Sequence, residues 1–472
     1  MAADPVSRAA GLLGGAVTVI PGGVSVQDPS RLRSPAMDRL VGEAVFGDEE
    51  QREAARWLLW ELGQSLGVRP ASIHDLYLAR GRGECAGFTV PAINLRVMAY
   101  DSARAVFRAA RSGRVGTLIL EIARSEIAYT DQRPAEYVAV LIGAALREGY
   151  RLPLFIQGDH CQVSAAKYAA DPDKEVGEVR KLVAEELAAG FYNIDVDTST
   201  LVDLGRPTLA EQQEANYRRA AELTRFIRER QPDGVTVSVG AEIGEVGHKN
   251  STVAELDAFM TGYLATCAEL GVRDGISKIS VQTGTSHGGV VLPDGSIAEV
   301  KLDLDALRDL SRVARESYGM AGAVQHGAST LPSNAFGNFP RVEAAEIHLA
   351  TNFQNIVFDH PALPEELRRR MYAWLDENAA GERKASDTDE QFYYKTRKKA
   401  IGPFKRDLWG LPEEARTAIA GELERTFAFL FEQLNVNGTA DLVDRTIQAP
   451  LLHHAAIEKV LVRAADDADA GE

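Results

Sequence analysis

The chain has 472 residues, of which 45% are hydrophobic and 25% charged. This ordinary globular composition excludes wholesale disorder, a collagen triple helix and a coiled coil. The net charge of −16 argues against nucleic acid or an anionic membrane as a partner. Three scattered cysteines are too few for a disulfide framework, and no apolar run reaches the ~18 residues that a membrane span needs. We therefore expect a soluble, cytoplasmic protein whose partner is a small molecule or another protein.

The predicted elements begin with an N-terminal extension over residues 1–85, whose clearest feature is an amphipathic helix at 48–66. From residue 86 onward, short apolar runs alternate with helical patterns. The eight predicted strands are 88–95, 117–123, 152–160, 191–197, 235–243, 276–284, 322–328 and 346–351. The helices predicted between them are 100–111, 136–148, 174–189, 209–230, 253–270 and 304–316, and another begins at 353. A C-terminal extension, 361–472, carries predicted helices at 364–378, 412–434 and 440–465.

The alternation over residues 86–360 predicts the fold class. Short strands followed by amphipathic helices are typical of βαβ units and a parallel sheet. Eight such units favour a (β/α)8 TIM barrel. A doubly wound open sheet is the competing arrangement, but no Gly-x-Gly-x-x-Gly follows the first strand. We expect an α/β protein with one barrel, an N-terminal extension and a C-terminal helical extension.

Polar residues close several of the predicted strands, where the catalytic groups of TIM barrels lie. Three histidines stand at such strand ends, His160, His287 and His326. Asp159 precedes His160 on the same strand, and the next two strands end in the carboxylates Asp197 and Glu242. Imidazole and carboxylate are the ligands that zinc prefers, and three protein ligands with one open position are typical of a catalytic zinc site. A polar rim of mutually hydrogen-bonded residues without metal is the alternative.

At this point the residues resemble a known family. The runs FTVPAINL, FIQGDH, GFYNIDVD, VGAEIGEVG, GTSHGG, QHGAST and EIHLATNFQN are similar, in order and spacing from about residue 72 to 360, to class II metal-dependent fructose-bisphosphate aldolases. Tagatose-bisphosphate aldolase subunits share part of the pattern. The resemblance implies a glycolytic-type, homo-oligomeric lyase that uses Zn²⁺ or another divalent metal. It would reversibly cleave a ketose phosphate, such as fructose 1,6-bisphosphate, to dihydroxyacetone phosphate and an aldehyde.

The resemblance also assigns expected roles to individual residues. The zinc ligands would be His160, His287 and His326, with Glu242 and Asp197 at a second or displaced metal position. Asp159 would exchange a proton with the hydroxyl or aldehyde oxygen, as an adjacent carboxylate can. The substrate would contact Asn94, Gly327, Ser329 and Thr351. Backbone carbonyls of Gly288 and Gly327 would bind a monovalent cation.

Three positions depart from the family's pattern. The loop glutamate that abstracts the substrate proton aligns with Asn250, so Glu245 or His248 on the same loop would have to replace it. The family's Asn-x-Asp-Thr on strand eight is His348-Leu-Ala-Thr here, which makes His348 a candidate substrate residue. Ala123 replaces a phosphate-binding serine, and the adjacent Arg124 could grip a phosphate or carboxylate.

Two other functions and one charged segment remain to be weighed. Lys278, in the sixth strand, could form a Schiff base and support metal-independent aldol chemistry, or it could point outward with its amine in solvent. The chain could also be a non-catalytic stabilising subunit of a tagatose-bisphosphate-type aldolase. The basic run 395–406 could supply a positive field for an anionic sugar, either at its own barrel mouth or at a neighbour's.

Overall fold

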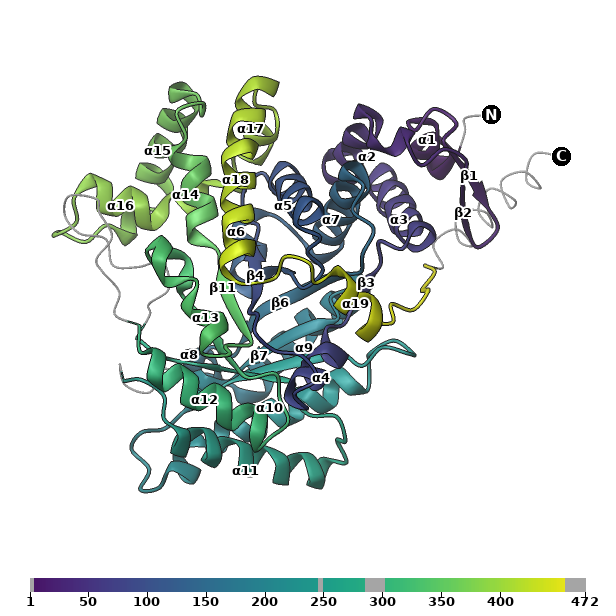
Figure 1. Cartoon of the computed structure of the whole chain (residues 1–472). Coiled ribbons are helices and arrows are strands. Elements are labelled where there is room, and N and C mark those ends of the chain that lie inside the picture. Colours follow the sequence, from purple (N-terminus) through teal and green to yellow (C-terminus); the bar gives the residue numbers. More distant parts are fainter. Residues whose placement is uncertain (1–3, 245–248, 285–301, 455–472) are drawn as a thin grey trace.

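The computed structural model describes residues 4–244, 249–284 and 302–454. Within these residues, eight parallel strands close into a (β/α)8 barrel, which confirms the predicted fold class (Figure 1). They are β4 (Val90–Asn94), β5 (Ile119–Ala123), β6 (Leu154–Gln162), β7 (Asn193–Asp197), β8 (Ser238–Glu242), β9 (Lys278–Val281), β10 (Ala323–Gln325) and β11 (Glu346–Leu349). Neighbours in sequence pair with one another, and β11 pairs with β4 to close the ring. Strands β4 and β5 are buried along their whole length, because parallel strands are covered on both faces.

Helices surround the barrel as predicted. They are α5 (Ala99–Gly113), α7 (Pro134–Glu148), α9 (Pro172–Ala189), α10 (Leu209–Arg228), α11 (Val253–Leu270), α12 (Leu304–Glu316) and α14 (Thr351–Asp359). Short helices occupy the loops: α6 (Arg124–Thr130), α8 (Ala165–Ala170) and α13 (Asn338–Arg341). Helix α10 begins at a capping box between Thr208 and Glu211, and α11 begins at one between Thr252 and Glu255. No helix within the described residues is long and apolar enough to cross a membrane.

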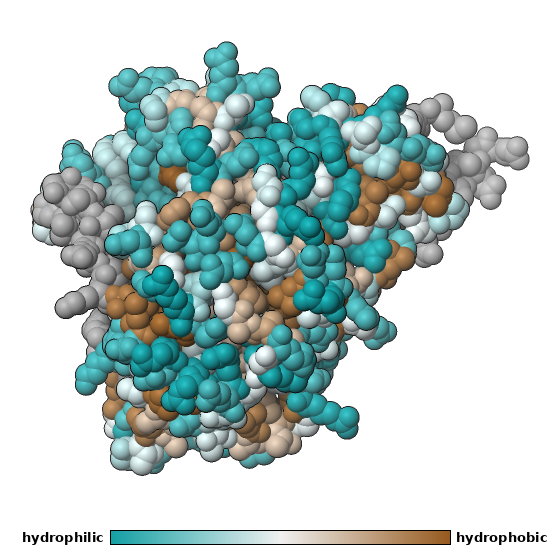
Figure 2. Space-filling view, viewed as in Figure 1, coloured by the Kyte–Doolittle hydropathy of each residue, from teal (hydrophilic) through white to brown (hydrophobic). Residues whose placement is uncertain are grey.

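The N-terminal extension packs on the barrel wall. Its elements are α1 (Pro5–Gly11), the hairpin β1 (Val17–Ile20) and β2 (Gly23–Val26), α2 (Pro35–Phe46), α3 (Glu49–Leu66), β3 (Pro70–Ala71) and α4 (His74–Gly81). Strand β3 pairs with the start of β6, and α4 follows it at the amino-terminal end of the barrel strands. Hydrophilic residues cover most of the face shown in Figure 2, and hydrophobic residues gather near the β1–β2 hairpin, where Ile20 is 43% exposed.

The C-terminal extension returns along both the barrel and the N-terminal helices. It contains α15 (Glu365–Asn378), α16 (Asp389–Thr396), α17 (Lys405–Trp409), α18 (Glu413–Gln433) and α19 (Ala440–Thr446). The predicted helix over 440–465 was too long, since α19 ends at Thr446. Pro450 lacks the amide hydrogen that a continuing helix would need. Beyond it, the Trp60 indole donates to the carbonyl of Leu452, and the remainder of the predicted helix, 455–465, lies outside the described residues.

Candidate active site

The end of strand β6 places Asp159 and His160 together at the rim of the barrel. Consecutive side chains of a regular strand point to opposite faces. Here the pairing of β6 with β7 shifts register between Gly158 and Cys161, and His160 has a left-handed φ of 46°. This bulge turns the backbone so that Asp159 contacts β11 while His160 contacts β7. A left-handed non-glycine residue is strained, so the surrounding contacts must hold it in place.

Two of the predicted histidine ligands meet in the structure. The rings of His160 and His326 have centroids 4.3 Å apart, and Nε2 of His326 lies 2.9 Å from Oγ of Ser280. Donor atoms of His160, Glu242 and His326 all lie within 4.8 Å of one another. Two imidazoles and a carboxylate are a donor set that suits zinc, so these residues fit a divalent metal. The third predicted histidine, His287, lies outside the described residues.

Asp197 was predicted as a metal-binding carboxylate. In the structure both of its carboxylate oxygens have partners, and one of them is His160. Its Oδ2 lies 3.3 Å from Nδ1 of His160, and its Oδ1 accepts hydrogen bonds from the amide and hydroxyl of Ser199. Burial opposes the charge of this carboxylate, but the hydrogen bonds from His160, Ser199 and Gln162 outweigh burial and lower its pKa. In this arrangement Asp197 orients the His160 ring, as carboxylates beside metal-binding histidines commonly do.

Glu242 ends strand β8 in a negatively charged environment. Burial raises its pKa to about 8, and the charges of Asp197 and Asp159 act in the same direction, against the opposing effect of His160. Carboxylates so close together repel one another, and a divalent cation bound among them would relieve that repulsion. The negative charge of the rim and the donor atoms that it offers therefore both favour a bound divalent cation.

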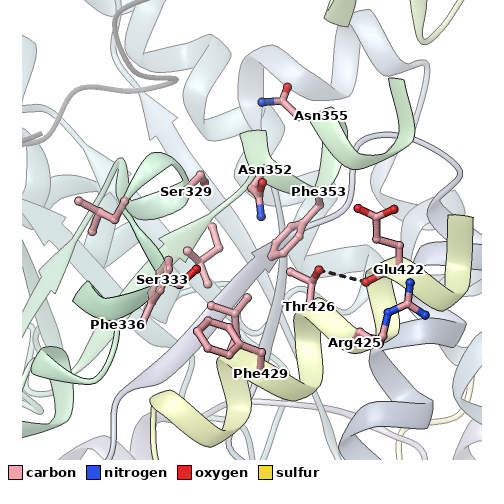
Figure 3. A pocket seen from close by; sticks show the side chains of 13 residues that line it. Ser329, Ser333, Phe336, Asn352, Phe353, Asn355, Glu422, Arg425, Thr426 and Phe429 are labelled. Atoms are coloured by element: carbon pink, nitrogen blue, oxygen red, sulfur yellow. Dashed lines mark hydrogen bonds between the residues drawn. The ribbon is translucent and has the colours of Figure 1, made fainter. Parts of the chain in front are cut away.

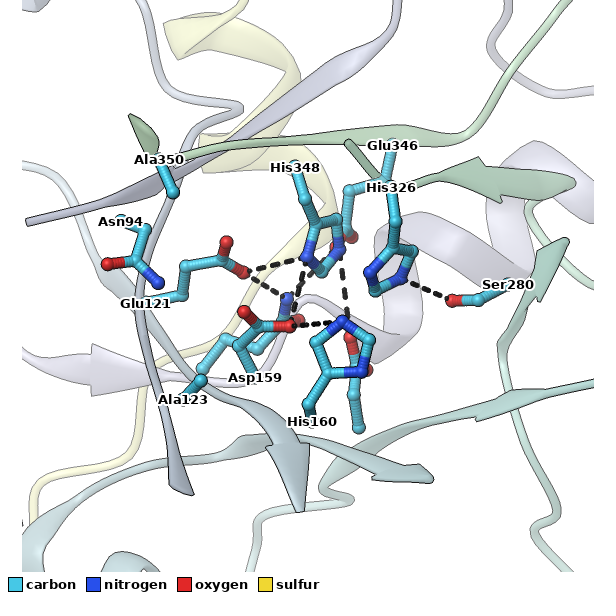
Figure 4. A network of polar contacts seen from close by, with 12 residues as sticks. Asn94, Glu121, Ala123, Asp159, His160, Ser280, His326, Glu346, His348 and Ala350 are labelled. Carbon is cyan, nitrogen blue, oxygen red and sulfur yellow. Dashed lines mark hydrogen bonds and ion pairs between the residues drawn. The ribbon is translucent and has the colours of Figure 1, made fainter. Parts of the chain in front are cut away.

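His348, predicted as a substrate residue, lies beside the candidate metal-binding histidines (Figure 4). Its ring stacks on that of His326 at a centroid distance of 4.1 Å. Its Nδ1 lies 3.1 Å from Oδ1 of Asp159 and 3.2 Å from Oε2 of Glu121. Asp159, His326 and His348 form a second group of possible metal-binding donors, which shares His326 with the first.

Lys278 lies inside the barrel and is completely buried. The alternative that placed it outward with its amine in solvent was wrong. Its Nζ donates to Gln157 Oε1 at 2.7 Å, to Asp195 Oδ2 at 3.0 Å and to Glu346 Oε1 at 2.6 Å. Burial opposes the ammonium charge, but Asp195 and Glu346 outweigh it and raise the pKa of Lys278. A protonated, fully hydrogen-bonded amine lacks the lone pair that a Schiff base requires, which argues against metal-independent chemistry.

The candidate substrate residues of strands β4 and β5 contact nearby polar groups. Asn94 Nδ2 donates to Glu126 Oε2 at 2.5 Å, and Nη2 of Arg96 lies 2.5 Å from Oε1 of the same carboxylate. Arg124, predicted to grip an anion, instead donates to the carbonyl of Gln162 and to Glu175 at 2.7 Å. A substrate anion would have to compete with Glu175 for this guanidinium.

Loop residues of the candidate site are only partly described. Gly327 has a left-handed φ of 68°, and Ser329 Oγ accepts a hydrogen bond from the amide of Ala350 at 2.6 Å, one residue before Thr351 begins α14. Asn250, at the family's glutamate position, donates to Asp303 at 2.9 Å. The predicted residues Glu245, His248 and Gly288 lie outside the described residues.

Within the basic run 395–406, Lys398 reaches the mouth of its own barrel, near Arg96, which follows β4. Most cations of the run have partners: Lys395 binds Asp387, Arg397 binds Asp359, Lys399 binds Glu382, and Lys405 binds Glu136. Lys398 forms no ion pair within the described residues and lies 5.7 Å from the ring centroid of Tyr129, on α6. Burial and the nearby charge of Arg96 lower the pKa of Lys398. The sequence indicated the basic run but gave no sign of Arg96.

A separate cavity of about 500 Å³ lies between the barrel wall and α18 (Figure 3). Phe353 and Phe429 line it, and Asn352 and Arg425 lie among its polar residues. Leu349 also lines this cavity. Because Leu349 and His348 are consecutive on β11, their side chains point to opposite faces. Leu349 therefore faces the cavity from the outer side of β11, away from the candidate metal-binding residues. Ser329, a predicted substrate residue, also lines the cavity.

Known proteins resemble this chain in sequence and in fold. Residues 82–405 match the family model described as Fructose-bisphosphate aldolase class-II. A search of curated proteins found no match. A fructose-bisphosphate aldolase from Campylobacter jejuni is 18% identical, covers 79% of this chain and 97% of its own, and has a TM-score of 0.45. A fructuronate-tagaturonate epimerase from Cohnella laeviribosi is 12% identical, covers 92% of this chain and 90% of its own, and has a TM-score of 0.51. The likeness to the epimerase, at 12% identity, concerns the fold alone.

Proposed function

Because the chain belongs to the class II fructose-bisphosphate aldolase family, we propose that it is a zinc-dependent aldolase that reversibly cleaves a phosphorylated ketose. The products would be dihydroxyacetone phosphate, or a close relative, and an aldehyde. The observation that carries the proposal is the convergence of His160, Glu242 and His326 donor atoms within 4.8 Å, beside Asp159. The phosphorylated substrate and the identity of the metal are parts of this proposal.

The chemistry assigns a task to each of these residues. His160, Glu242 and His326 would hold the metal, which supplies Lewis-acid stabilisation of developing negative charge when bound. Asp159 would accept the proton of the substrate hydroxyl as the carbon–carbon bond breaks, and would return it to the aldehyde oxygen in the reverse direction. The electron pair of the broken bond passes to the ketone half as an enediolate. A second group must then protonate its carbon, and Glu245 and His248 are our candidates for that step.

Two cations at the barrel mouth support an anionic substrate. Arg96 shares Glu126 with Asn94, and Lys398 lies over α6 without an ion pair among the described residues. Arg96 is already paired with Glu126, so Lys398 is the cation that could attract an anionic group here, on a protein that is strongly acidic as a whole. A phosphate or carboxylate on the substrate would be attracted to this part of the rim.

A second candidate function is the epimerisation of a ketose through the same bond cleavage. Ala123 and Ala350 replace the family's phosphate-binding serine and an aspartate that holds dihydroxyacetone phosphate, so the substrate walls differ while the candidate metal-binding residues remain. If the aldehyde half turned before the bond reformed, the product would be an epimer. A sugar acid would suit the cations of the rim as well as a phosphate would.

The test is turnover by the purified, metal-loaded protein of a panel of ketose monophosphates, ketose bisphosphates and keto-uronic acids. We expect cleavage of at least one phosphorylated ketose, loss of activity with EDTA and recovery with zinc. His160→Ala and His326→Ala should both be inactive, whereas His453→Ala, at a histidine outside the barrel, should resemble the wild type. Epimerised sugar acids without free aldehyde would favour the second function.

Two results would contradict the proposal altogether. Protein without bound metal and without turnover of any substrate would favour the non-catalytic subunit. Borohydride trapping of a substrate on Lys278, with activity unaffected by EDTA, would favour the Schiff-base mechanism.

A further inference from the structure

A layer of charged and polar side chains fills the barrel directly beneath the candidate metal-binding residues. A TIM barrel interior is normally packed with branched apolar residues. Here Glu121, Gln157, Asp195, Lys278 and Glu346 project inward, and each is at most 5% exposed. Burying this many ionisable groups costs free energy unless they are paired and hydrogen-bonded. Their contacts are therefore informative about what the layer does.

Glu346 is the most densely contacted member of the layer. Its Oε1 accepts hydrogen bonds from Lys278 at 2.6 Å, from His348 at 2.7 Å and from Gln157 at 3.0 Å. Its Oε2 accepts the hydroxyl of Tyr77, which reaches into the barrel from α4. With both oxygens engaged from different directions, this carboxylate has one fixed orientation.

The fixed carboxylate determines where the His348 ring lies. Glu346 and His348 are two residues apart on β11 and therefore share its inward face. Glu346 holds Nε2 of the ring from below and His326 stacks against its side. On the other edge of the ring, Asp159 and Glu121 lie 3.1 Å and 3.2 Å from Nδ1. Without the contact to Glu346, the ring could rotate about its Cβ–Cγ bond and withdraw Nδ1 from Asp159.

We propose that Glu346, held by Lys278, is a positioning residue that aims His348 at Asp159, the proposed proton-transfer carboxylate. This inference rests on the proposed function for its catalytic consequence, although the positioning itself is a property of the fold. Through His348, Glu346 would thus keep Asp159 in a productive orientation, in the way that outer partners orient metal-site residues.

A matched pair of variants separates positioning from charge balance. Glu346→Gln and Asp195→Asn each remove one negative charge from the same buried lysine, at carboxylates 2.6 Å and 3.0 Å from its Nζ. Of these two carboxylates, only Glu346 is within hydrogen-bond distance of His348, because Oδ2 of Asp195 is 3.7 Å from Nε2. A role limited to charge balance predicts equal effects from the two variants, and positioning predicts unequal ones.

Glu346→Gln replaces the charged acceptor of His348 with a weaker amide oxygen and turns the other oxygen into a donating amide group. We expect it to lower kcat by about 10-fold or more with KM and metal content unchanged, which is within the range typical of disturbing such a partner. Asp195→Asn should stay within about 2-fold of the wild-type kcat. If Glu346→Gln does not fold, Tyr77→Phe releases Oε2 without changing the charge, and should lower kcat by a smaller factor. Equal losses in the two charge variants, or no loss in Glu346→Gln or Tyr77→Phe, would overturn the proposal.

A second measurement does not depend on the reaction. In metal-loaded protein labelled with ¹⁵N-histidine, the ring signals of His348 are identified by their disappearance in His348→Ala. They should shift in Glu346→Gln and remain unchanged in Asp195→Asn. Unshifted signals in Glu346→Gln would overturn the positioning even in an active enzyme. Shifted signals in a protein that turns over no substrate would support the positioning while the proposed function fails.

Discussion

Replacing Lys278 with methionine would remove the lysine from the layer of charged and polar side chains inside the barrel, which we call the ionic layer, while keeping an unbranched side chain of similar length. Asp195 and Glu346 would then be left as neighbouring buried carboxylates without their shared cation. Solvent has no access to compensate, because Lys278 and Glu346 are each 0% exposed and Asp195 is 5% exposed. We expect Lys278→Met to fold but to be strongly destabilised.

The magnitude follows from the contacts that are lost. Removing one partner of a buried ion pair typically costs about 3–5 kcal/mol. Lys278 serves two carboxylates at 2.6 and 3.0 Å and also donates to Gln157. Protonation of Asp195 in the variant would recover part of the cost, since burial already raises the pKa of that carboxyl. A loss of about 4 kcal/mol is therefore expected, a large share of the ~5–15 kcal/mol typical of a folded protein.

Chemical denaturation of the metal-loaded proteins, followed by circular dichroism, measures this loss. The control is Lys278→Met combined with Glu346→Gln, which removes one charge of each sign. This double variant should recover part of the lost stability, because it removes one of the two carboxylates that the first substitution leaves without their cation. Stability of Lys278→Met within about 1 kcal/mol of the wild type would refute the reasoning, because it would mean that the buried carboxylates do not depend on this cation.

Two further predictions concern other buried and half-buried charges. Burial raises the pKa of Glu186 to about 8, against a hydrogen bond from Cys161 that lowers it. The folded protein thus holds a proton that the unfolded chain has released, so stability should fall as the pH rises from about 4.5 to 8. Glu186→Gln should flatten this dependence in melting temperatures measured at several pH values, and identical slopes would contradict the assignment. Lys398→Ala should raise KM for a phosphorylated ketose roughly 10-fold with kcat unchanged. The control is Lys399→Ala, which should leave both constants unchanged because the Lys399 ammonium already binds Glu382. Equal effects of the two variants would show that Lys398 does not contact the substrate.

The barrel could be predicted from the sequence because its signals are local. Each strand is a short apolar run beside a helix with its own capping residues, and the polar residues at the strand ends mark the rim. The meeting of His160 with His326 followed directly from barrel topology, since all parallel strands end at the same face. The length of the last helix was overestimated, because the apolar pattern continues past Thr446, where α19 ends, and residues 447–454 are not helical.

The ionic layer could not be predicted because its members are far apart in the sequence. Gln157, Lys278 and Glu346 come from three strands separated by more than sixty residues, and no spacing rule connects them. The inward direction of Lys278 depends on the register of β9, and a shift of one residue would have turned it outward. The bulge at His160 could not be predicted either, since the sequence Gly158-Asp159-His160 contains no signal for a left-handed histidine.

The pairing of Arg124 shows a third kind of limit. In the sequence, Arg124 follows the position of the family's phosphate-binding serine. In the structure it begins α6, directly after strand β5. Its partner, Glu175, comes from α9, on the next βα unit, and occupies the guanidinium. A residue's position along a strand was therefore predictable, whereas competition for its side chain by a distant carboxylate was not.

The central claim is that His160, Glu242 and His326 hold a divalent metal. The most direct measurement is the metal content per chain of the purified protein, determined by mass spectrometry after dialysis against zinc and then against buffer. The account predicts close to one tightly bound zinc per chain in the wild type and a large loss of metal in His326→Ala. A wild type that retains no metal, or a His326→Ala variant that retains as much as the wild type, would contradict it.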